Sequence, residues 1–169
     1  MIKKNVMRVI MLIIAVNLIS CDSIKKATEP EDIGMYAFEL LKTLSQTTKS
    51  DYVNSFLTIE EIRVLGKNEV VVTDSDIRNE LTSMPKEEWV EDIEDDYNEL
   101  KQDGGKNGIK WAEIEYLDFV YEMDNLGGIK VCEGELFFKY KEDSYSVDLA
   151  AIFDGTEYKL VKLAYLEMQ

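Results

Sequence analysis

The chain has 169 residues, of which 46% are hydrophobic, and it carries 19 basic and 34 acidic side chains, for a net charge of −15 at pH 7. This length suits one domain with a packed core, and the excess of acids repels phosphate backbones, so we expect no binding to nucleic acid. The chain has no histidine, which excludes Ser-His-Asp and Cys-His nucleophilic sites and imidazole metal ligands. We expect no cofactor and no metal site.

The first 20 residues are typical of a bacterial secretory signal. Lys3, Lys4 and Arg8 form a positive end, and an apolar run over residues 9–16 follows. The run is well short of the ~20 residues that cross a bilayer as a helix. It leads into the tetrapeptide Leu18-Ile19-Ser20-Cys21.

This tetrapeptide resembles the lipobox of bacterial lipoproteins, in which an aliphatic residue and a small residue precede a cysteine. The resemblance implies that residues 1–20 are removed as a signal peptide and that the sulfur of Cys21 receives a diacylglyceryl group. Palmitate-like acyl chains contribute ~0.8 kcal/mol per buried methylene, so two or three of them anchor firmly. We therefore expect a protein of the cell envelope, lipid-anchored to the inner or the outer membrane, with its domain outside the cytosol. An uncleaved membrane anchor and a soluble secreted product are the alternatives.

The first part of the mature chain favours helices. Residues 21–30 lack an apolar period and are expected to form a lipidated tether, whereas residues 31–169 are expected to form one domain. Apolar residues at helical spacing predict a helix over 31–47. Thr58 and Glu61 form a capping box at the start of another helix, which Gly66 is expected to end.

Further helices and one short strand are expected before residue 109. Val70–Val72 suits a short strand, residues 73–76 suit a helix start, and a longer helix is expected over 85–102, ended by Gly104-Gly105. Acids crowd this longer helix, and Asp92 and Asp96 lie one turn apart. A solvated acidic face is the favoured interpretation, because no calcium-binding loop motif is present.

From Ile109 onward the apolar period changes from helical to alternating, which predicts strands over 109–124, 128–141, 144–153 and 156–167. The dipeptide Asp154-Gly155 is a strong hairpin signal between the last two strands. The fold class is therefore α+β, with N-terminal helices packed on a C-terminal four-stranded antiparallel meander.

This order of elements resembles the NTF2-like and cystatin-like α+β domains, in which a curved meander wraps against helices. The chain departs from the NTF2-like pattern by having more helices before the first long strand. The resemblance implies either a cavity for a small apolar ligand or a dimer formed through the sheet.

The candidate ligand-binding residues are expected on one face of the first strand. They are Trp111, Glu113, Glu115, Phe119 and Tyr121, with Glu133 and Glu135 on the neighbouring strand. Aromatic rings beside carboxylates suit a binding platform, and a carboxylate pair is also what glycoside hydrolysis requires. Alternating acids are equally typical of a solvent-facing strand. Cys132 falls on the apolar face of the second strand and is expected to be a small buried side chain.

These observations favour a non-catalytic envelope lipoprotein whose domain binds a ligand or another protein. The first 20 residues hold three of the 19 bases and none of the acids, so the mature part carries a net charge of −18. This charge supports an alternative, an inhibitor or immunity-type lipoprotein that neutralises a basic partner. A small glycan-active enzyme that uses the strand carboxylates is the third interpretation.

Overall fold

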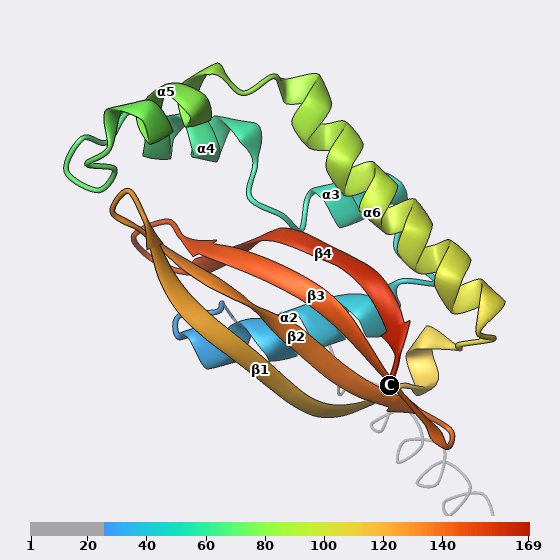
Figure 1. Ribbon diagram of the computed structural model, residues 1–169. Coiled ribbons are helices and arrows are strands. Elements are labelled where there is room, and N and C mark those ends of the chain that lie inside the picture. Colours follow the sequence, from blue (N-terminus) through green and yellow to red (C-terminus); the bar gives the residue numbers. More distant parts are fainter. Residues whose placement is uncertain (1–25) are drawn as a thin grey trace, which may run out of the picture.

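The computed structural model describes residues 26–169, so the predicted signal peptide and Cys21 lie outside the described residues. Helices come first and four strands follow (Figure 1). The helices are α2 (Pro30–Thr43), α3 (Lys49–Val53), α4 (Ile59–Gly66), α5 (Ser75–Ser83) and α6 (Lys86–Lys106), followed by the 3-10 turn η2 (Trp111–Glu113). The strands are β1 (Glu115–Leu126), β2 (Ile129–Tyr140), β3 (Asp143–Phe153) and β4 (Tyr158–Met168). The predicted α+β class is confirmed. Within residues 26–169, no helix is both long and apolar enough to cross a membrane.

The strands form an antiparallel meander in the order β1-β2-β3-β4. Gly127 and Gly128 connect β1 to β2 with φ angles of 58° and 106°, which a glycine adopts without strain. The β3–β4 connection is a four-residue loop, because Phe153 pairs with Tyr158. Within it, the Asp154 carboxylate accepts hydrogen bonds from two backbone N–H groups. The hairpin predicted at Asp154-Gly155 is confirmed, with a longer loop than the dipeptide indicates.

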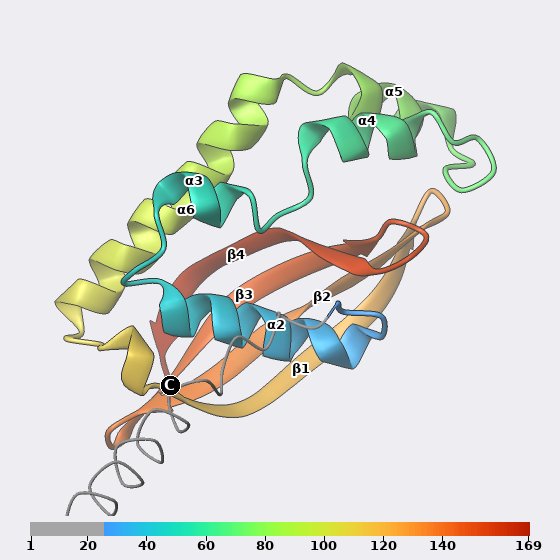
Figure 2. The same cartoon turned by 180° about the vertical axis from the view of Figure 1, so that it is seen from behind.

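Helix α2 covers one face of the sheet (Figure 2). Alternate residues of the strands point toward it and are buried with the apolar stripe of the helix. Cys132 is fully buried on this face, as predicted. Burial raises the pKa of its thiol to about 11, so the cysteine is an unreactive packing group. The sheet contributes Phe119, Cys132, Leu136, Phe138, Tyr145, Val147, Leu149, Ala151 and Leu160 to this core.

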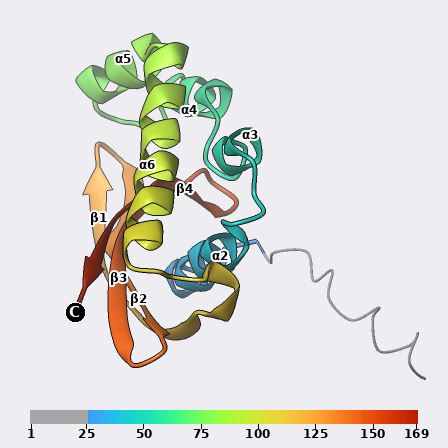
Figure 3. The ribbon, with the colours of Figure 1, turned by 90° about the vertical axis from the view of Figure 1, so that its right-hand side faces the viewer.

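The opposite sheet face is covered only in part. At the end that contains the β1–β2 turn, Val131 of β2 packs with Leu65 of α4 and with Val72. Helix α6 runs along β4, at the edge of the sheet (Figure 3). The middle of this face, over β1, β2 and β3, stays open.

The outer edge of β4 is closed by other parts of the chain. Ala27 forms a bridge with Tyr158, Phe56 forms one with Leu160, and the Tyr52 hydroxyl donates to the Leu163 carbonyl oxygen at 3.0 Å. Because Ala27 is 2% exposed, the folded domain begins a few residues earlier than the sequence predicted.

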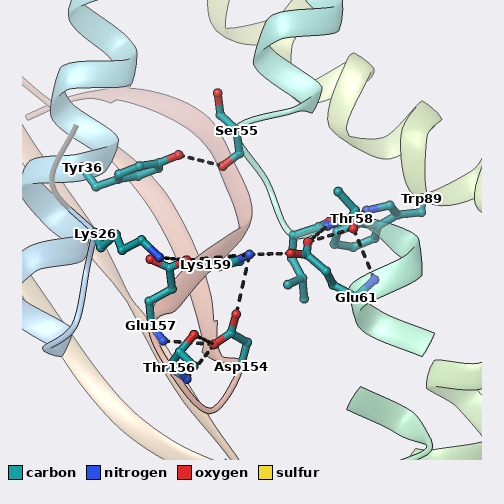
Figure 4. Close-up of polar contacts among 11 residues, drawn as sticks. Lys26, Tyr36, Ser55, Thr58, Glu61, Trp89, Asp154, Thr156, Glu157 and Lys159 are labelled. Atoms are coloured by element: carbon teal, nitrogen blue, oxygen red, sulfur yellow. Dashed lines mark hydrogen bonds and ion pairs between the residues drawn. The ribbon is translucent and has the colours of Figure 1, made fainter. Parts of the chain in front are cut away.

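A polar cluster around Lys159 joins α4 to the β3–β4 loop (Figure 4). The Lys159 ammonium group donates to the Glu61 carboxylate and lies within 4 Å of Asp154 and Glu157. Glu61 also accepts from the backbone N–H of Thr58, so the predicted capping box is confirmed. Figure 4 also shows the Tyr36 hydroxyl, which donates to the Ser55 carbonyl oxygen.

Helix α4 ends at Gly66, as expected, but without a left-handed residue, since the following Lys67 has a φ of −84°. A Cβ on Gly66 would clash with Leu81 of α5, so the contact between the two helices requires this glycine. The short strand expected after α4 is wrong. Val70–Val72 form a turn and not a strand. The side-chain oxygen of Asn68 accepts from the N–H groups of Val70 and Val71, which holds the backbone away from an extended conformation.

The end of α6 also differs from the prediction. Gly104 and Gly105 were expected to end the helix, but it continues to Lys106. A Cβ on Gly104 would clash with the indole ring of Trp111, whereas one on Gly105 would meet no atom within 4 Å. Gly104 is therefore required by a close helix–ring contact and not by a turn.

Candidate functional site

Trp111, the largest of the predicted site residues, belongs to the core. It lies in η2, before β1 begins, and not on the strand as predicted. Trp111 is 3% exposed and packs between Gly104 and Phe138. The ring centroids of Trp111 and Phe138 are 5.9 Å apart. The indole therefore offers no surface to a ligand.

Phe119 and Tyr121 are neighbours, as predicted, but they face α2. Phe119 is 8% exposed and lies against Gly34 of the helix. Its ring stacks on that of Tyr121 at 5.2 Å. The Tyr121 hydroxyl donates to the Glu31 carboxylate at 2.7 Å, and this bond raises the pKa of Tyr121 to about 12. These contacts hold α2 to the sheet.

A β-bulge separates the predicted glutamates from the aromatic rings. The register passes from Tyr116 opposite Phe138 to Asp118 opposite Phe137, so Leu117 is an extra residue. An extra residue reverses the alternation of side chains. Glu115 and Phe119 therefore lie on opposite faces, and the predicted common face is wrong. Glu113 lies outside the strand and pairs with Lys110 at 3.1 Å.

The open side of the sheet holds a different group of carboxylates. A concavity of about 710 Å³ lies over β1, β2 and β3, on the face opposite α2. Glu133 and Glu135 of β2 line it, whereas Glu113 and Glu115 do not. The charged side chains that line it are Glu122, Asp124, Glu133, Glu135, Asp148 and Lys162. We call this surface the acidic concavity.

Like charges lie directly opposite one another in the acidic concavity. Glu122 pairs in register with Glu133 across β1 and β2, and Glu135 pairs with Asp148 across β2 and β3. Directly opposed like charges destabilise a sheet by a few tenths of a kcal/mol to about 1 kcal/mol. Lys162 lies 3.8 Å from Asp148 and relieves one of the two pairs only in part. This arrangement costs stability, so packing alone does not account for it.

A smaller acidic hollow adjoins this surface between α6 and β4. It measures about 390 Å³ and shares Lys162 with the acidic concavity. Asp96 of α6 is half-buried in it. Loss of hydration raises the pKa of Asp96 to about 6, despite the nearby Lys162 ammonium group. The α6 acids that line the hollow are Asp92, Asp95, Asp96 and Glu99.

The two hollows together form an acidic surface that suits cationic groups. Among residues 26–169, no group of three potential ligands has the spacing to hold a metal ion. What the surface offers is a set of hydrogen-bond acceptors spread over three strands and a helix. Several separate ammonium or guanidinium groups would each find a carboxylate there.

Sequence reasoning identified the acids of β2 but not their neighbours. Glu122, Asp124 and Asp148 occupy the same face because the strands pair in register. The alternation of acids along 118–124 was a usable signal. The register of these acids with β2 follows from the two-residue turn at Gly127-Gly128, which places Leu126 opposite Ile129.

Comparisons with known proteins assign no family. No family model and no curated protein matches the chain. Among solved structures, the chain is similar to a cystatin-like protein from Ruminococcus gnavus, with 15% sequence identity and a TM-score of 0.44. The similarity covers 82% of this chain and 46% of the other, so this chain spans about half the length of that protein. A similarity this distant assigns no function.

Proposed function

We propose that this chain is a non-catalytic binding protein of the bacterial cell envelope, and that its acidic concavity docks a positively charged protein. The observation that carries the proposal is the lining of that surface, in which five carboxylates surround a single ammonium group. Opposite charge accelerates encounter and selects against acidic partners. A basic partner would also relieve the repulsion between Glu122 and Glu133.

The partner we favour is a basic toxin or enzyme that the domain neutralises outside the cytosol. The mature chain carries a net charge of −18, which extends the attraction beyond the contact surface itself. The buried positions of Trp111 and Phe119 weigh against an aromatic platform for a small apolar ligand. They also weigh against a glycan-active site built from those rings.

Binding to a cationic probe tests the proposal. The full chain in non-ionic detergent is titrated with a short oligolysine peptide, and two double variants are compared. Glu133→Gln with Glu135→Gln removes two charges from the acidic concavity, and Glu113→Gln with Glu115→Gln removes two charges outside it. We expect Kd to rise about tenfold for the first variant and less than about twofold for the second.

Salt provides an independent check. A contact formed by several ion pairs weakens as ionic strength rises, because the Debye length falls to about 8 Å at physiological salt. Equal weakening in both double variants, or an affinity that does not change with salt, would exclude the acidic concavity as the binding surface.

The lipid anchor is a second part of the proposal, supported by the sequence Leu18-Ile19-Ser20-Cys21. Cells that express the chain are labelled with radioactive palmitate, and we expect the label on the wild-type protein and not on Cys21→Ser. Cys132→Ser is the matched control, because that thiol is buried in the core. Processing that is unaffected by globomycin would argue against a lipoprotein.

A further inference from the structure

The two edges of the sheet differ. The β4 edge is occupied by bridges to Ala27 and Phe56. Strand β1 pairs with β2 alone, and none of its backbone groups bonds to a backbone group of another described element. Figures 1 and 3 show no described element alongside its outer edge. A 12-residue strand with a free edge is a site for strand addition.

The hydrogen bonds of β1 show which groups point outward. The N–H groups of Phe119 and Asn125 donate to the carboxylates of the residues before them, at 2.9 and 2.7 Å, and so do not pair with β2. Outward and inward groups alternate along a strand. Since no bulge interrupts 118–126, Tyr121 and Met123 also direct their N–H and C=O groups outward. Among the described residues, none donates to the C=O groups of Tyr121 and Met123 or accepts from their N–H groups.

The composition of β1 indicates what would cover this edge. Four of the nine large hydrophobic side chains that are exposed in residues 26–169 lie on this strand, namely Leu117, Val120, Met123 and Leu126. The strand carries four acids and no base over residues 115–126. A second copy would therefore oppose acid with acid, which disfavours self-pairing. A basic strand would match both the charge and the apolar side chains.

We propose that an extended, basic segment of a partner protein adds to β1 as a fifth strand. This rests on the proposed function and specifies how the partner binds. The segment pairs with the backbone of Tyr121 and Met123, and its basic side chains project over the face that carries Glu122 and Glu133. The apolar side chains of the segment project over the opposite face of the sheet, beside the exposed side chain of Met123. Backbone pairing provides affinity, and the acidic concavity selects for charge.

A pair of peptides separates backbone pairing from charge attraction. The probe is a peptide in which lysine and valine alternate. Its control has the same sequence with consecutive backbone amides N-methylated, so that neither edge can pair. Both are titrated against the full chain in non-ionic detergent. We expect Kd for the methylated peptide to be at least about tenfold higher, because two or more hydrogen bonds are lost.

Amide hydrogen exchange locates the contact. On addition of the unmodified peptide we expect the amides of Tyr121 and Met123 to exchange at least about tenfold more slowly. The amides of Val120 and Glu122 already face β2 and serve as internal controls. The variant Met123→Pro removes one outward N–H group without touching the β1–β2 ladder, and we expect it to weaken binding of the unmodified peptide alone.

The outcomes separate the two proposals. Equal binding of both peptides would overturn strand addition and leave charge docking intact. Failure of both peptides to bind would overturn strand addition together with the proposed function. Slow exchange of Tyr121 and Met123 without any peptide would show that the edge is already occupied by this chain or a second copy, and would also overturn strand addition.

Discussion

The ammonium group of Lys159 on β4 bonds to the carboxylate of Glu61 on α4, which links the helical part of the chain to the sheet across 98 residues of sequence. Burial raises the pKa of Glu61, but the hydrogen bonds from Lys159 and Thr58 outweigh it, so the pKa is lowered overall. Glu61 thereby caps its own helix and holds that helix on β4 at the same time.

Replacement of Lys159 by methionine should remove this link. We expect Lys159→Met to lower the free energy of unfolding by about 1 kcal/mol at pH 7, a value in the range of partly exposed charged hydrogen bonds. Chemical denaturation measures it. Lys86→Met is the matched control. Lys86 of α6 pairs with Glu60, which lies on α4 next to Glu61, but both side chains of this pair are largely exposed. A loss of stability as large in the control would contradict the role given to Lys159.

The same pair predicts a dependence on pH. Because the pKa of Glu61 is lower in the folded than in the unfolded chain, its contribution is complete above the ordinary value of 4.5 and is lost as pH falls below it. The difference in stability between wild type and Lys159→Met should therefore shrink as denaturation is repeated at increasingly acidic pH. A difference that stays constant down to pH about 3 would contradict the prediction.

Asp96 should have the opposite dependence. Its pKa is raised from 3.8 to about 6, so its charged form destabilises the fold, and stability is lost as pH rises between these values. We expect Asp96→Asn to stabilise the chain by about 1 kcal/mol at pH 7, a figure reduced for the partial exposure of the side chain, and by little at pH about 4. Asp95→Asn, at an exposed position of the same helix, is the control and should change stability less at either pH.

The two adjacent glycines of α6 should respond in opposite ways to alanine. Gly104→Ala places a methyl group against the indole ring of Trp111, and we expect a loss of about 2 kcal/mol. Gly105→Ala meets open space, and we expect a gain of about 0.5–1 kcal/mol from the helix propensity of alanine. Thermal unfolding measures both. Stabilisation by Gly104→Ala would mean that the close contact with Trp111 is absent.

The charges of the acidic concavity should favour binding of a cationic partner and lower the stability of the fold. Glu133→Gln removes the repulsion across the pair with Glu122, and we expect a gain of up to about 0.5 kcal/mol in the free energy of unfolding. The same variant should bind oligolysine more weakly. Glu69→Gln removes one exposed acid from a turn outside this surface and should change neither quantity measurably. A variant of Glu133 that loses both stability and binding would point to a structural role for the residue.

The sequence predicted the fold class and the positions of β2, β3 and β4 because both depend on local periodicity. The capping box at Thr58 and the hairpin at Asp154-Gly155 are local signals as well, and both were found. The roles of glycine that were missed depend on distant partners. Gly104 is required by its contact with Trp111, and Gly66 by its contact with Leu81. The residues adjacent to each glycine in the sequence do not indicate these contacts.

The candidate site was missed for a related reason. The face to which Glu115 points depends on the one-residue bulge at Leu117, and the sequence does not reveal a bulge without its paired strand. Trp111 was assigned to the strand because the alternating pattern extends backward through it. In the structure that stretch forms a 3-10 turn, which turns the indole into the core.

The closure of β4 by Ala27 and Phe56 limits the size of any assembly built on this sheet. With the β4 edge covered, the sheet formed by residues 26–169 offers the β1 edge for the attachment of a further strand. Because the β4 edge stays closed when a segment adds to β1, the domains cannot stack through both edges of the sheet into an open-ended fibril. A protein with an exposed strand can in this way remain finite in its associations, even when crowded together with its own copies.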